Sequence, residues 1–525
     1  MTLSMPSPLT WGAALLTAVL TTASWAGTAD DLSALSNVTS RVAPLIGAAS
    51  SCQSIEQSRV QNLVAQFRAI LKLVATSDTD RQTVVQMFDR YVLDGRSAIA
   101  AGQITCKTVE QQLSDLEQSV FPPGTPPGTG PALPTGPAAT ATPPANDTQQ
   151  SNVVRGVSDH EIRFGIVGPF TGVARDLGRQ MELGINTAFN KVNEAGGIAG
   201  RQLHLFHADD GYEPSRTLAA MRQLYEKDNV FANIGNVGTP TTAVALPFAI
   251  ENRTIMFGSF TGAPFLRNKP PDRYVFNYRA SYEEETRATV RYLLKVRRLQ
   301  PSQIAVFAQA DAYGDAGYAG VAKAFRQLGL NDNTILRVNY KRNTIDVGDA
   351  VKTLREQKQR IGAIIMVATY RAAAKFIEKT RDVLPNVIYT SVSFVGSSEL
   401  ANELKLLGPR YAQGVIVTQV VPSVGGYSNT VLDYKDALKK YFPGETPTYV
   451  GLEGYITASL LIEGLKRTGP QLDTEKLVDA LDSIHDLDLG LGVPLGFSRV
   501  DHQASHQVWA TMLDANGDFQ PLDFE

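Results

Sequence analysis

The chain has 525 residues, of which 43% are hydrophobic and 19% are charged. This length exceeds what one compact core usually holds and predicts two or more domains. The formal net charge is −3 and the charged residues form no basic stripe, so the composition argues against nucleic-acid binding.

The chain begins with an apolar run, 12–22, that is shorter than a bilayer-spanning helix. Small residues follow at Ser24 and Ala26, which is typical of a secretory signal peptide cleaved after Ala26. No Lys or Arg precedes the run, and a retained N-terminal anchor is the alternative interpretation. We therefore predict a signal peptide over residues 1–26 and a periplasmic location for the rest of the chain.

Residues 27–120 show helical spacing and little glycine. In 59–75 the apolar residues recur at every third or fourth position, which predicts an amphipathic helix. The only two cysteines, Cys52 and Cys106, also lie here, and a disulfide is expected in an oxidising compartment. Two buried free thiols are the alternative. We predict a small helical accessory domain, for which docking of another protein is an open role.

Residues 121–150 are rich in Pro, Gly and Thr and contain few side chains able to enter a core. This composition predicts an interdomain linker. An extended arm packed against a domain is the alternative, and the scarcity of large apolar residues argues against it.

From Glu161 onward, short β-rich segments alternate with helical segments, which predicts a mainly parallel sheet covered on both faces. The alternation begins again near residue 284, and one sheet does not easily accommodate all of these strands. The predicted fold class is α/β, with two Rossmann-like lobes and a cleft between them, preceded by the small α-helical domain.

The stretch "IGNVGTPTT" at 234–242 joins a β-rich segment to a helix. In a parallel α/β lobe, ligands bind at such junctions. Small residues let a ligand approach the backbone, and the helix amides and the hydroxyls of Thr239, Thr241 and Thr242 favour a carboxylate or another anionic oxygen group. A plain glycine turn with a threonine cap is the alternative. No lysine follows in the manner of a phosphate-binding loop.

From about residue 160 to its end, the chain resembles the type I periplasmic solute-binding proteins of the leucine/isoleucine/valine-binding class, which serve ABC transporters. The resemblance rests on the order and spacing of "FGIVGPFTGVARDLGRQMELGINTAFNKVNEAGGIAGRQLHLFHADDGYEPSRT", "IGNVGTPTTAVALPFAIENRTIMFGSFTGAPFLR", "YGDAGYAGV" and "GVIVTQVVP". It implies that residues 151–525 form two lobes that close on a ligand.

The resemblance also implies three segments that cross between the lobes. They are expected near Arg279–Glu283, Gln413–Gly414 and Leu491–Pro494. The first lobe would then comprise about 160–280 and 414–490, and the second about 284–413 and 495–525.

The family's ligand site carries over to two turns of the first lobe and to two tyrosines of the second. The turns would bind a ligand carboxylate, and Tyr313 would reach across from the second lobe beside Tyr370. Judged alone, both tyrosines fit a packing role better, and only their expected place in the cleft makes a ligand role equally well supported. The residues implied are Val237, Gly238, Thr239, Phe260, Thr261, Tyr313 and Tyr370.

Two positions depart from the family's amino-acid binders. Ser393 stands where those proteins have an acidic residue for the α-ammonium, and Leu177 stands where the branched-chain binders have a lid aromatic. A buried ammonium without a carboxylate would be costly. An organic acid or an aromatic carboxylate is therefore as well supported as an amino acid.

The predicted function is an extracytoplasmic receptor that captures a small carboxylate and delivers it to a membrane ABC permease. A ligand-sensing regulatory protein of the same fold is the alternative. We expect no enzyme activity, no cofactor and no metal. The chain has no Gly-x-Ser-x-Gly motif, and His204 and His207 would point apart in a strand. The pair Asp209–Asp210 is better explained by loop solvation or helix capping.

Overall fold

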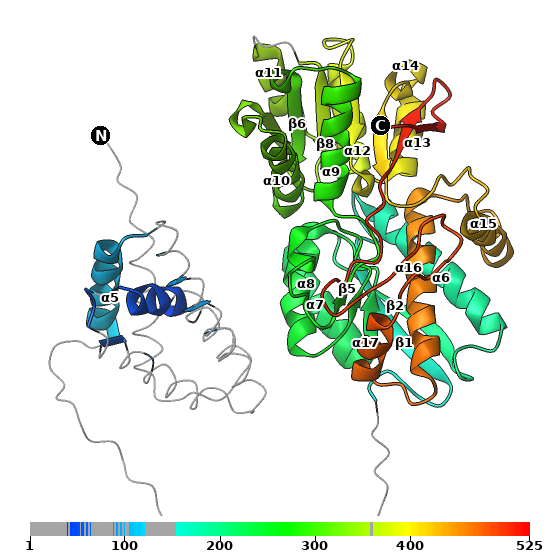
Figure 1. Ribbon diagram of the computed structural model, residues 1–525, viewed down its shortest axis with the longest axis horizontal. Helices are drawn as coiled ribbons and strands as arrows, with labels where there is room; N and C mark the ends of the chain where they lie inside the picture. The colour runs from blue at the N-terminus through cyan, green and yellow to red at the C-terminus, as the bar shows by residue number, and fades with distance from the viewer. Residues whose placement is uncertain are drawn as a thin grey trace, which may run out of the picture. The chain divides into compact units, whose positions relative to one another are not determined.

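A computed structural model describes residues 154–357 and 361–524 and, between 39 and 120, several shorter stretches. The chain forms two compact units, Met1–Asp147 and Thr148–Glu525 (Figure 1). The predicted signal peptide and the predicted linker over 121–150 lie outside the described residues. No helix in the described part of the chain has both the length and the apolar character needed to cross a bilayer.

The first unit has a small helical core that includes a disulfide. Cys52 and Cys106 are bonded, with their Cα atoms 5.6 Å apart, which confirms the expected disulfide. Cys106 begins helix α5, Cys106–Val120, whose Val109 and Leu113 are fully buried. Most of the predicted helix over 59–75 lies outside the described residues.

The first lobe of the second unit contains a parallel five-stranded sheet in the order β2-β1-β3-β4-β5. Helices cover both faces of the sheet, so β1, β3, β4 and β5 are mostly buried, whereas the edge strand β2 is half exposed. The strands are β1 Glu161–Gly168, β2 Gln202–Asp209, β3 Ala232–Ile234, β4 Met256–Phe257 and β5 Val275–Phe276. The helices are α6 Arg175–Glu194, α7 Pro214–Arg222, α8 Thr239–Glu251, α15 Asn429–Tyr441, α16 Tyr449–Thr468 and α17 Thr474–Asp482.

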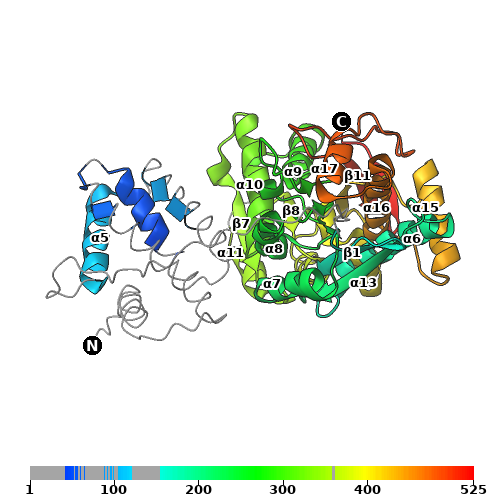
Figure 2. The ribbon, with the colours of Figure 1, turned by 90° about the horizontal axis from the view of Figure 1, so that it is seen from below.

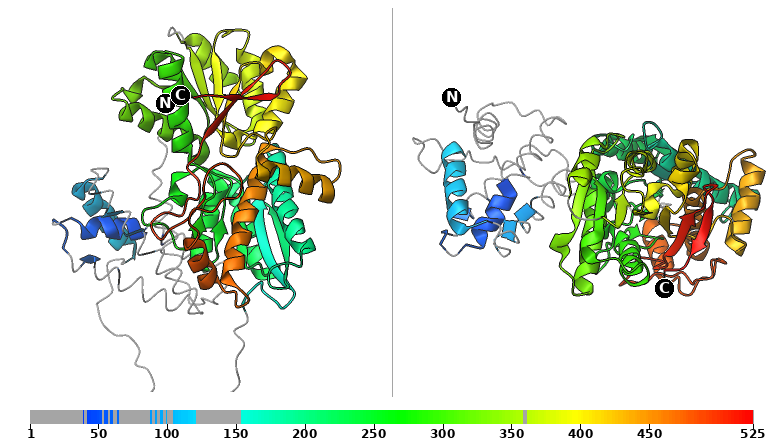
Figure 3. Two further views of the ribbon diagram at one scale, coloured as in Figure 1. Left: turned by 45° about the vertical axis from the view of Figure 1, so that its right-hand side comes forward. Right: turned by 90° about the horizontal axis from the view of Figure 1, so that it is seen from above.

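The second lobe contains a seven-stranded sheet in the order β12-β11-β10-β9-β8-β6-β7. Its five earlier strands are parallel, and β11 and β12, red in Figure 3, add to the sheet in antiparallel pairing. The strands are β6 Ile304–Gln309, β7 Leu336–Tyr340, β8 Ala363–Val367, β9 Ile388–Ser391, β10 Ile416–Gln419, β11 Trp509–Leu513 and β12 Phe519–Leu522. The helices are α9 Tyr282–Arg291, α10 Ala312–Gln327, α11 Gly348–Glu356, α12 Tyr370–Thr380, α13 Ser397–Leu407 and α14 Pro409–Ala412.

Helix α16 returns to the first lobe and packs along α6 (Figure 2). The backbones of the two helices touch: a Cβ added at Gly184 would lie 1.9 Å from the carbonyl oxygen of Gly451. Glycine is therefore required where these two helices pack. This contact holds α16, which comes late in the sequence, against the first lobe.

Three segments cross between the lobes, and two lie elsewhere than predicted. The first, 277–281, joins β5 to α9. The placement at Gln413–Gly414 is wrong, because β10 follows it and pairs with β9 and β11 in the second sheet. The placement at Leu491–Pro494 is also wrong, because this stretch precedes Phe497, whose ring packs on Phe276 of the first lobe.

The second crossing instead follows Gln419, and the third runs over 503–508, beside the first. There Gln503 pairs with Asn277 in a parallel bridge. The first lobe consequently comprises 154–276 and about 420–502, and the second lobe 282–419 and 509–522. The predicted lobe limits at 414, 490 and 495 are corrected accordingly.

Candidate functional site

The turn after β3 lies at the edge of the first sheet that faces the second lobe. Gly238 precedes α8 with a φ of 109°, a backbone conformation that glycine adopts readily. Val237 beside it is 1% exposed. A Cβ added at Gly238 would lie 2.3 Å from the ring of Tyr212. The sequence predicts that small residues here let a ligand approach, and the structure shows the Tyr212 ring against this backbone.

Three buried hydroxyls meet beside this turn. The Oγ1 atom of Thr239 lies 2.7 Å from that of Thr261 and 3.2 Å from the hydroxyl of Tyr282. Thr261 and Tyr282 are also in contact, at 3.3 Å. Burial raises the pKa of Tyr282, so its phenol stays protonated and able to donate. The structure thus brings together two predicted residues and one that was not predicted.

An aromatic cluster joins the two lobes next to these hydroxyls. The ring of Phe394, which follows β9, lies 4.9 Å from Phe260 and 4.7 Å from Tyr313. Tyr212 and Tyr282 are at 6.3 and 6.4 Å from the same ring. The predicted residues Phe260 and Tyr313 therefore meet through a phenylalanine that had not been singled out. Rings at these separations favour closure of one lobe on the other.

A buried arginine lies in the first crossing segment. Arg279 is 1% exposed, and its Nη2 donates to Glu285, at 3.1 Å, and to the hydroxyl of Ser393. The other carboxylate oxygen of Glu285 accepts from the Ser393 amide, at 2.7 Å, and from the Thr418 hydroxyl, at 2.5 Å. Ser393, the position expected to face a ligand ammonium, contacts a guanidinium of the protein itself.

A second acid lies beside this arginine. Glu453 of α16 places Oε1 3.5 Å from Nη1 of Arg279. Burial raises the pKa of Glu453 to about 7, although the charge of Arg279 opposes the rise. The guanidinium carbon lies 5.0 Å from the Phe260 ring and 5.8 Å from the Tyr282 ring. The charged groups are therefore adjacent to the aromatic and hydroxyl groups.

Tyr370 and Leu177 connect the lobes elsewhere. The Tyr370 hydroxyl lies 2.8 Å from the carbonyl oxygen of Val173 and 2.7 Å from a carboxylate oxygen of Asp176. Leu177 is fully buried against Gly396, where an added Cβ would lie 2.6 Å from the leucine side chain. These two predicted residues thus form contacts between the lobes, at Val173, Asp176 and Gly396.

A comparison with protein families assigns residues 161–518 to a family described as periplasmic binding protein. The match spans most of the chain. The chain belongs to the periplasmic binding protein family. This family consists of substrate-binding proteins, and membership implies an extracytoplasmic location. The resemblance seen in the sequence and the predicted α/β fold are thereby confirmed.

Individual relatives of this periplasmic binding protein agree with that assignment. The Leu/Ile/Val-binding protein homolog 3 of Brucella melitensis is 25% identical over 336 residues, covering 63% of this chain and 86% of the relative. A possible leucine/isoleucine/valine-binding protein from Rhodopirellula baltica, known as a crystal structure, is 35% identical with a TM-score of 0.66, over 71% of this chain and 99% of that one. A substrate-binding periplasmic protein from Ralstonia solanacearum is 26% identical with a TM-score of 0.63, over 69% and 100%.

The charged cluster of this periplasmic binding protein was not anticipated from its sequence. Arg279 falls in a crossing segment, where it reads as a surface residue between aromatics in "FNYRASY". Glu285 follows two other glutamates and reads as part of an acidic first helical turn. Glu453 offered the one usable signal, since it is the only charged residue in the apolar stretch "YVGLEGYITASLLI".

The pair Asp209–Asp210 has structural partners in this periplasmic binding protein. Asp209 accepts from the Phe170 amide at 2.9 Å, and its pKa falls to about 2 because such hydrogen bonds outweigh its partial burial. Asp210 accepts from the Tyr212 amide at 2.8 Å and from Thr217 at 2.9 Å, while burial raises its pKa to about 6. Both acids order the turn after β2. Within the described ranges, no cluster of His, Cys, Asp and Glu is arranged to hold a metal ion.

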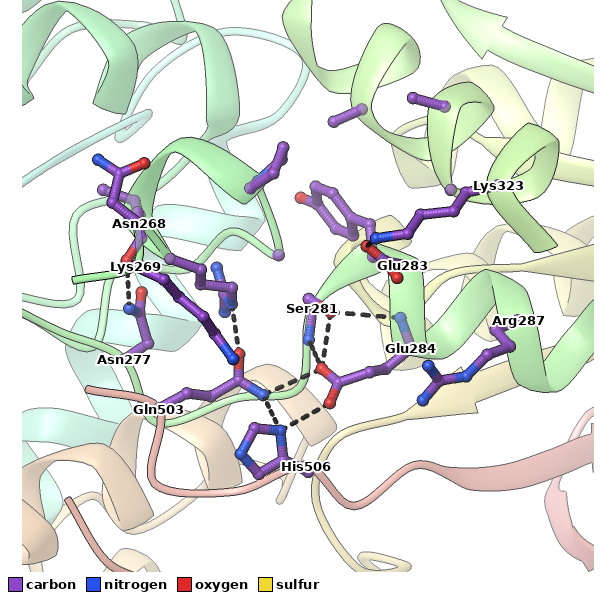
Figure 4. Close-up of a pocket in the computed structure, with 18 of the residues that line it drawn as sticks. Asn268, Lys269, Asn277, Ser281, Glu283, Glu284, Arg287, Lys323, Gln503 and His506 are labelled. Carbon is purple, nitrogen blue, oxygen red and sulfur yellow. Dashed lines mark hydrogen bonds and ion pairs between the residues drawn. The ribbon is translucent and has the colours of Figure 1, made fainter. Parts of the chain in front are cut away.

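The first and third crossing segments are tied together by a polar network (Figure 4). Glu284 accepts from the amide and hydroxyl of Ser281, at 2.7 and 2.6 Å, and from Gln503 at 3.0 Å. His506 places Nδ1 2.7 Å from Glu284. These residues line a cavity of about 550 Å³ that also touches α10. The network therefore lies where the lobes must pivot.

The ion pair in this network predicts a pH-dependent stability. Glu284 raises the pKa of His506, and hydrogen bonds lower the pKa of Glu284 to about 2 against its burial. The pair stabilises the fold fully between about pH 4.5 and pH 6.5, and it weakens as pH rises through the raised pKa of His506 or falls toward that of Glu284. His506→Ala should therefore cost about 1 kcal/mol near pH 6 and less near pH 8, with solvent screening included.

Urea unfolding followed by the fluorescence of Trp509 measures this cost, since no other tryptophan follows Trp25. His485→Ala is the matched control, because His485 is exposed and lies outside the network that contains His506 and Glu284. A cost for His506→Ala that is equal at both pH values, or equal to that of the control, would contradict the role of the ion pair.

Proposed function

We propose that this protein is a periplasmic receptor that captures a small carboxylate by closure of its two lobes and delivers it to a membrane ABC permease. Relatives whose names specify leucine, isoleucine and valine support a small carboxylate as the ligand class. Residues 1–26 would serve as the signal peptide, and residues 27–120 as an accessory domain that takes no part in ligand binding.

The observation that carries this proposal is the group of three hydroxyls formed by Thr239, Thr261 and Tyr282. The hydroxyl of Thr239 sits at the first turn of α8, where the helix amides carry partial positive charge. Hydroxyl donors and a helix N-terminus together stabilise an anionic oxygen group. The group lies beside rings from both lobes, so that closure would bury a ligand bound there.

Direct contacts across the lobes support capture by closure. Arg342 of the second lobe forms an ion pair with Glu213 of the first, at 2.9 Å, and Asn343 donates to the same carboxylate at 2.6 Å. Tyr370 adds its bonds to Val173 and Asp176. These contacts are polar and partly exposed, so they can break and reform as the lobes open and close.

A thermal-shift screen of amino acids, aromatic acids and dicarboxylates tests the proposal. A true ligand at a hundred times its Kd should stabilise the protein by about 2.7 kcal/mol. Binding only of cationic or uncharged compounds would contradict a carboxylate receptor.

Thr239→Val should weaken binding of the ligand that the screen identifies by about tenfold or more, because it removes a hydroxyl donor to a charged group. Titration calorimetry measures the affinity. Thr187→Val is the matched control: Thr187 is fully buried in α6, and its hydroxyl bonds to the carbonyl of Leu183 at 2.7 Å. Both variants should lose similar stability, and only Thr239→Val should lose affinity. Equal affinities would show that the Thr239 hydroxyl serves only its contacts with Thr261 and Tyr282.

A further inference from the structure

Arg279 carries more hydrogen-bond donors than its surroundings accept. Its Nη2 atom is engaged by Glu285 and Ser393. Its Nε and Nη1 atoms have no hydrogen-bond partner, although the residue is 1% exposed. Guanidinium nitrogens all carry N–H groups, and a buried donor without an acceptor costs free energy. The arrangement favours an acceptor brought in by a ligand.

The carboxylates around Arg279 are poorly placed to receive a cation. Both oxygens of Glu285 already accept, one from Arg279 and the other from Ser393 and Thr418. Glu453 lies 3.5 Å from Nη1, and burial raises its pKa to about 7, so that much of it is protonated near neutral pH. The unused hydrogen-bonding capacity of this cluster is therefore that of the N–H donors of Arg279.

We infer that Arg279 binds a carboxylate of the transported solute, and that this solute is an organic acid without an ammonium group. The inference rests on the proposed function and names the ligand class of the same site. Arg279 lies against the rings of Phe260 and Tyr282, and the Tyr282 hydroxyl faces the two threonines. The guanidinium and the two threonine hydroxyls therefore both lie beside Tyr282, and both kinds of donor suit an anion.

Proton exchange on binding distinguishes an acid from an amino acid. The charged and titratable groups around Glu453 are Arg279, Arg267, Glu285 and Tyr278. A ligand carboxylate beside Glu453 adds negative charge, disfavours its ionised form and makes the protein take up a proton. A ligand ammonium there would favour the ionised form and release one. The two ligand classes thus give opposite signs.

The experiment compares amino acids with the acids that lack only the amino group: leucine with isocaproate, phenylalanine with hydrocinnamate, and glutamate with glutarate. Calorimetry on the full chain, in buffers of different ionisation enthalpy, gives both affinity and proton exchange. In at least one pair the simple acid should bind about tenfold or more tightly, with proton uptake. Its affinity should fall by up to about tenfold per pH unit above about pH 7.

Two matched variants test whether Glu453 is the group that takes up the proton on ligand binding. Glu453→Gln should retain acid binding and abolish proton uptake. Glu399→Gln should retain both, although Glu399 is likewise buried with a pKa raised to about 7 by burial. Arg279→Gln should weaken acid binding by about a hundredfold. If that variant fails to fold, the two glutamate variants still decide the question.

Preferential binding of amino acids, with proton release, would overturn the inference and leave the proposed function intact. Tight acid binding that is unchanged in folded Arg279→Gln would overturn it as well. If neither member of any pair binds and the wider thermal-shift screen also finds no carboxylate, the proposed function fails, and the inference falls with it.

Discussion

Replacing Glu285 by glutamine should lower the free energy of unfolding of the two-lobed unit by about 3 to 5 kcal/mol, because it removes the hydrogen-bonded ionic partner of the buried Arg279 and leaves only the more distant Glu453, 3.5 Å from Nη1. Glu285 is fully buried. Its carboxylate accepts hydrogen bonds from Arg279 at 3.1 Å, from the Ser393 amide at 2.7 Å and from the Thr418 hydroxyl at 2.5 Å. A neutral amide cannot replace the charge, and its NH₂ group would face donors. Urea unfolding followed by Trp509 fluorescence measures the loss.

Glu283→Gln is the control for this experiment. Glu283 lies on the same helix, and its ion pair with Lys323, at 2.8 Å, is partly exposed, with side-chain exposures of 33% and 49%. Such surface pairs contribute less than about 1 kcal/mol. Similar losses in the two variants would show that Glu285 does not stabilise a buried charge. A variant that restores stability by replacing both Glu285 and Arg279 with apolar residues would identify their pairing as the cause.

Replacing Cys52 and Cys106 together by serine should destabilise the first unit by about 4 kcal/mol, because the disulfide closes a long loop in the unfolded chain. The separation of the two cysteines is 54 residues. The described core of this unit is small, and a loss of this size is a large share of what such a domain normally has. Hydrogen exchange of peptides covering 42–50 and α5 should become fast. These segments hold buried residues such as Ala43 and Val109.

The second unit serves as the internal control for the disulfide. The unfolding midpoint reported by Trp509 should not change in the serine variant or when the parent protein is reduced. The affinity for any ligand found by the screen should also stay the same. Slow exchange in 42–50 after reduction would show that the helices hold without the bond, and an altered Trp509 midpoint would show that the two units depend on each other.

The two α/β lobes could be predicted because their signals are local. Buried parallel strands and the helices that cover them leave apolar runs and helical spacing in each segment. The sheet that a strand joins has no such signal. β10 reads as an apolar strand, but only its pairing with β9 and β11 reveals that it belongs to the second lobe. The second and third crossing segments were therefore predicted at the wrong positions.

The site was predictable to the same extent. The turn at Gly238 could be found, since a glycine with positive φ before a helix leaves a compositional trace. The contact between Arg279 and Glu453 could not, because the two residues come from a crossing segment and from a helix far along the chain. Their contact depends on α16 packing back onto α6 through Gly184 and Gly451. Charge complementarity between distant segments is a property of the folded molecule.

The late position of β11 has a consequence for how the chain is made. β11 pairs with β10 along 416–419, and β12 then covers β11, so the second sheet is incomplete until residues 509–522 have been synthesised. Before that, β10 is an open edge, which is where strands of other chains add. A nascent or C-terminally clipped molecule therefore carries an aggregation-prone edge that the finished protein conceals. The nascent chain should therefore depend most on chaperones after β10 has been synthesised and before β11 has paired with it.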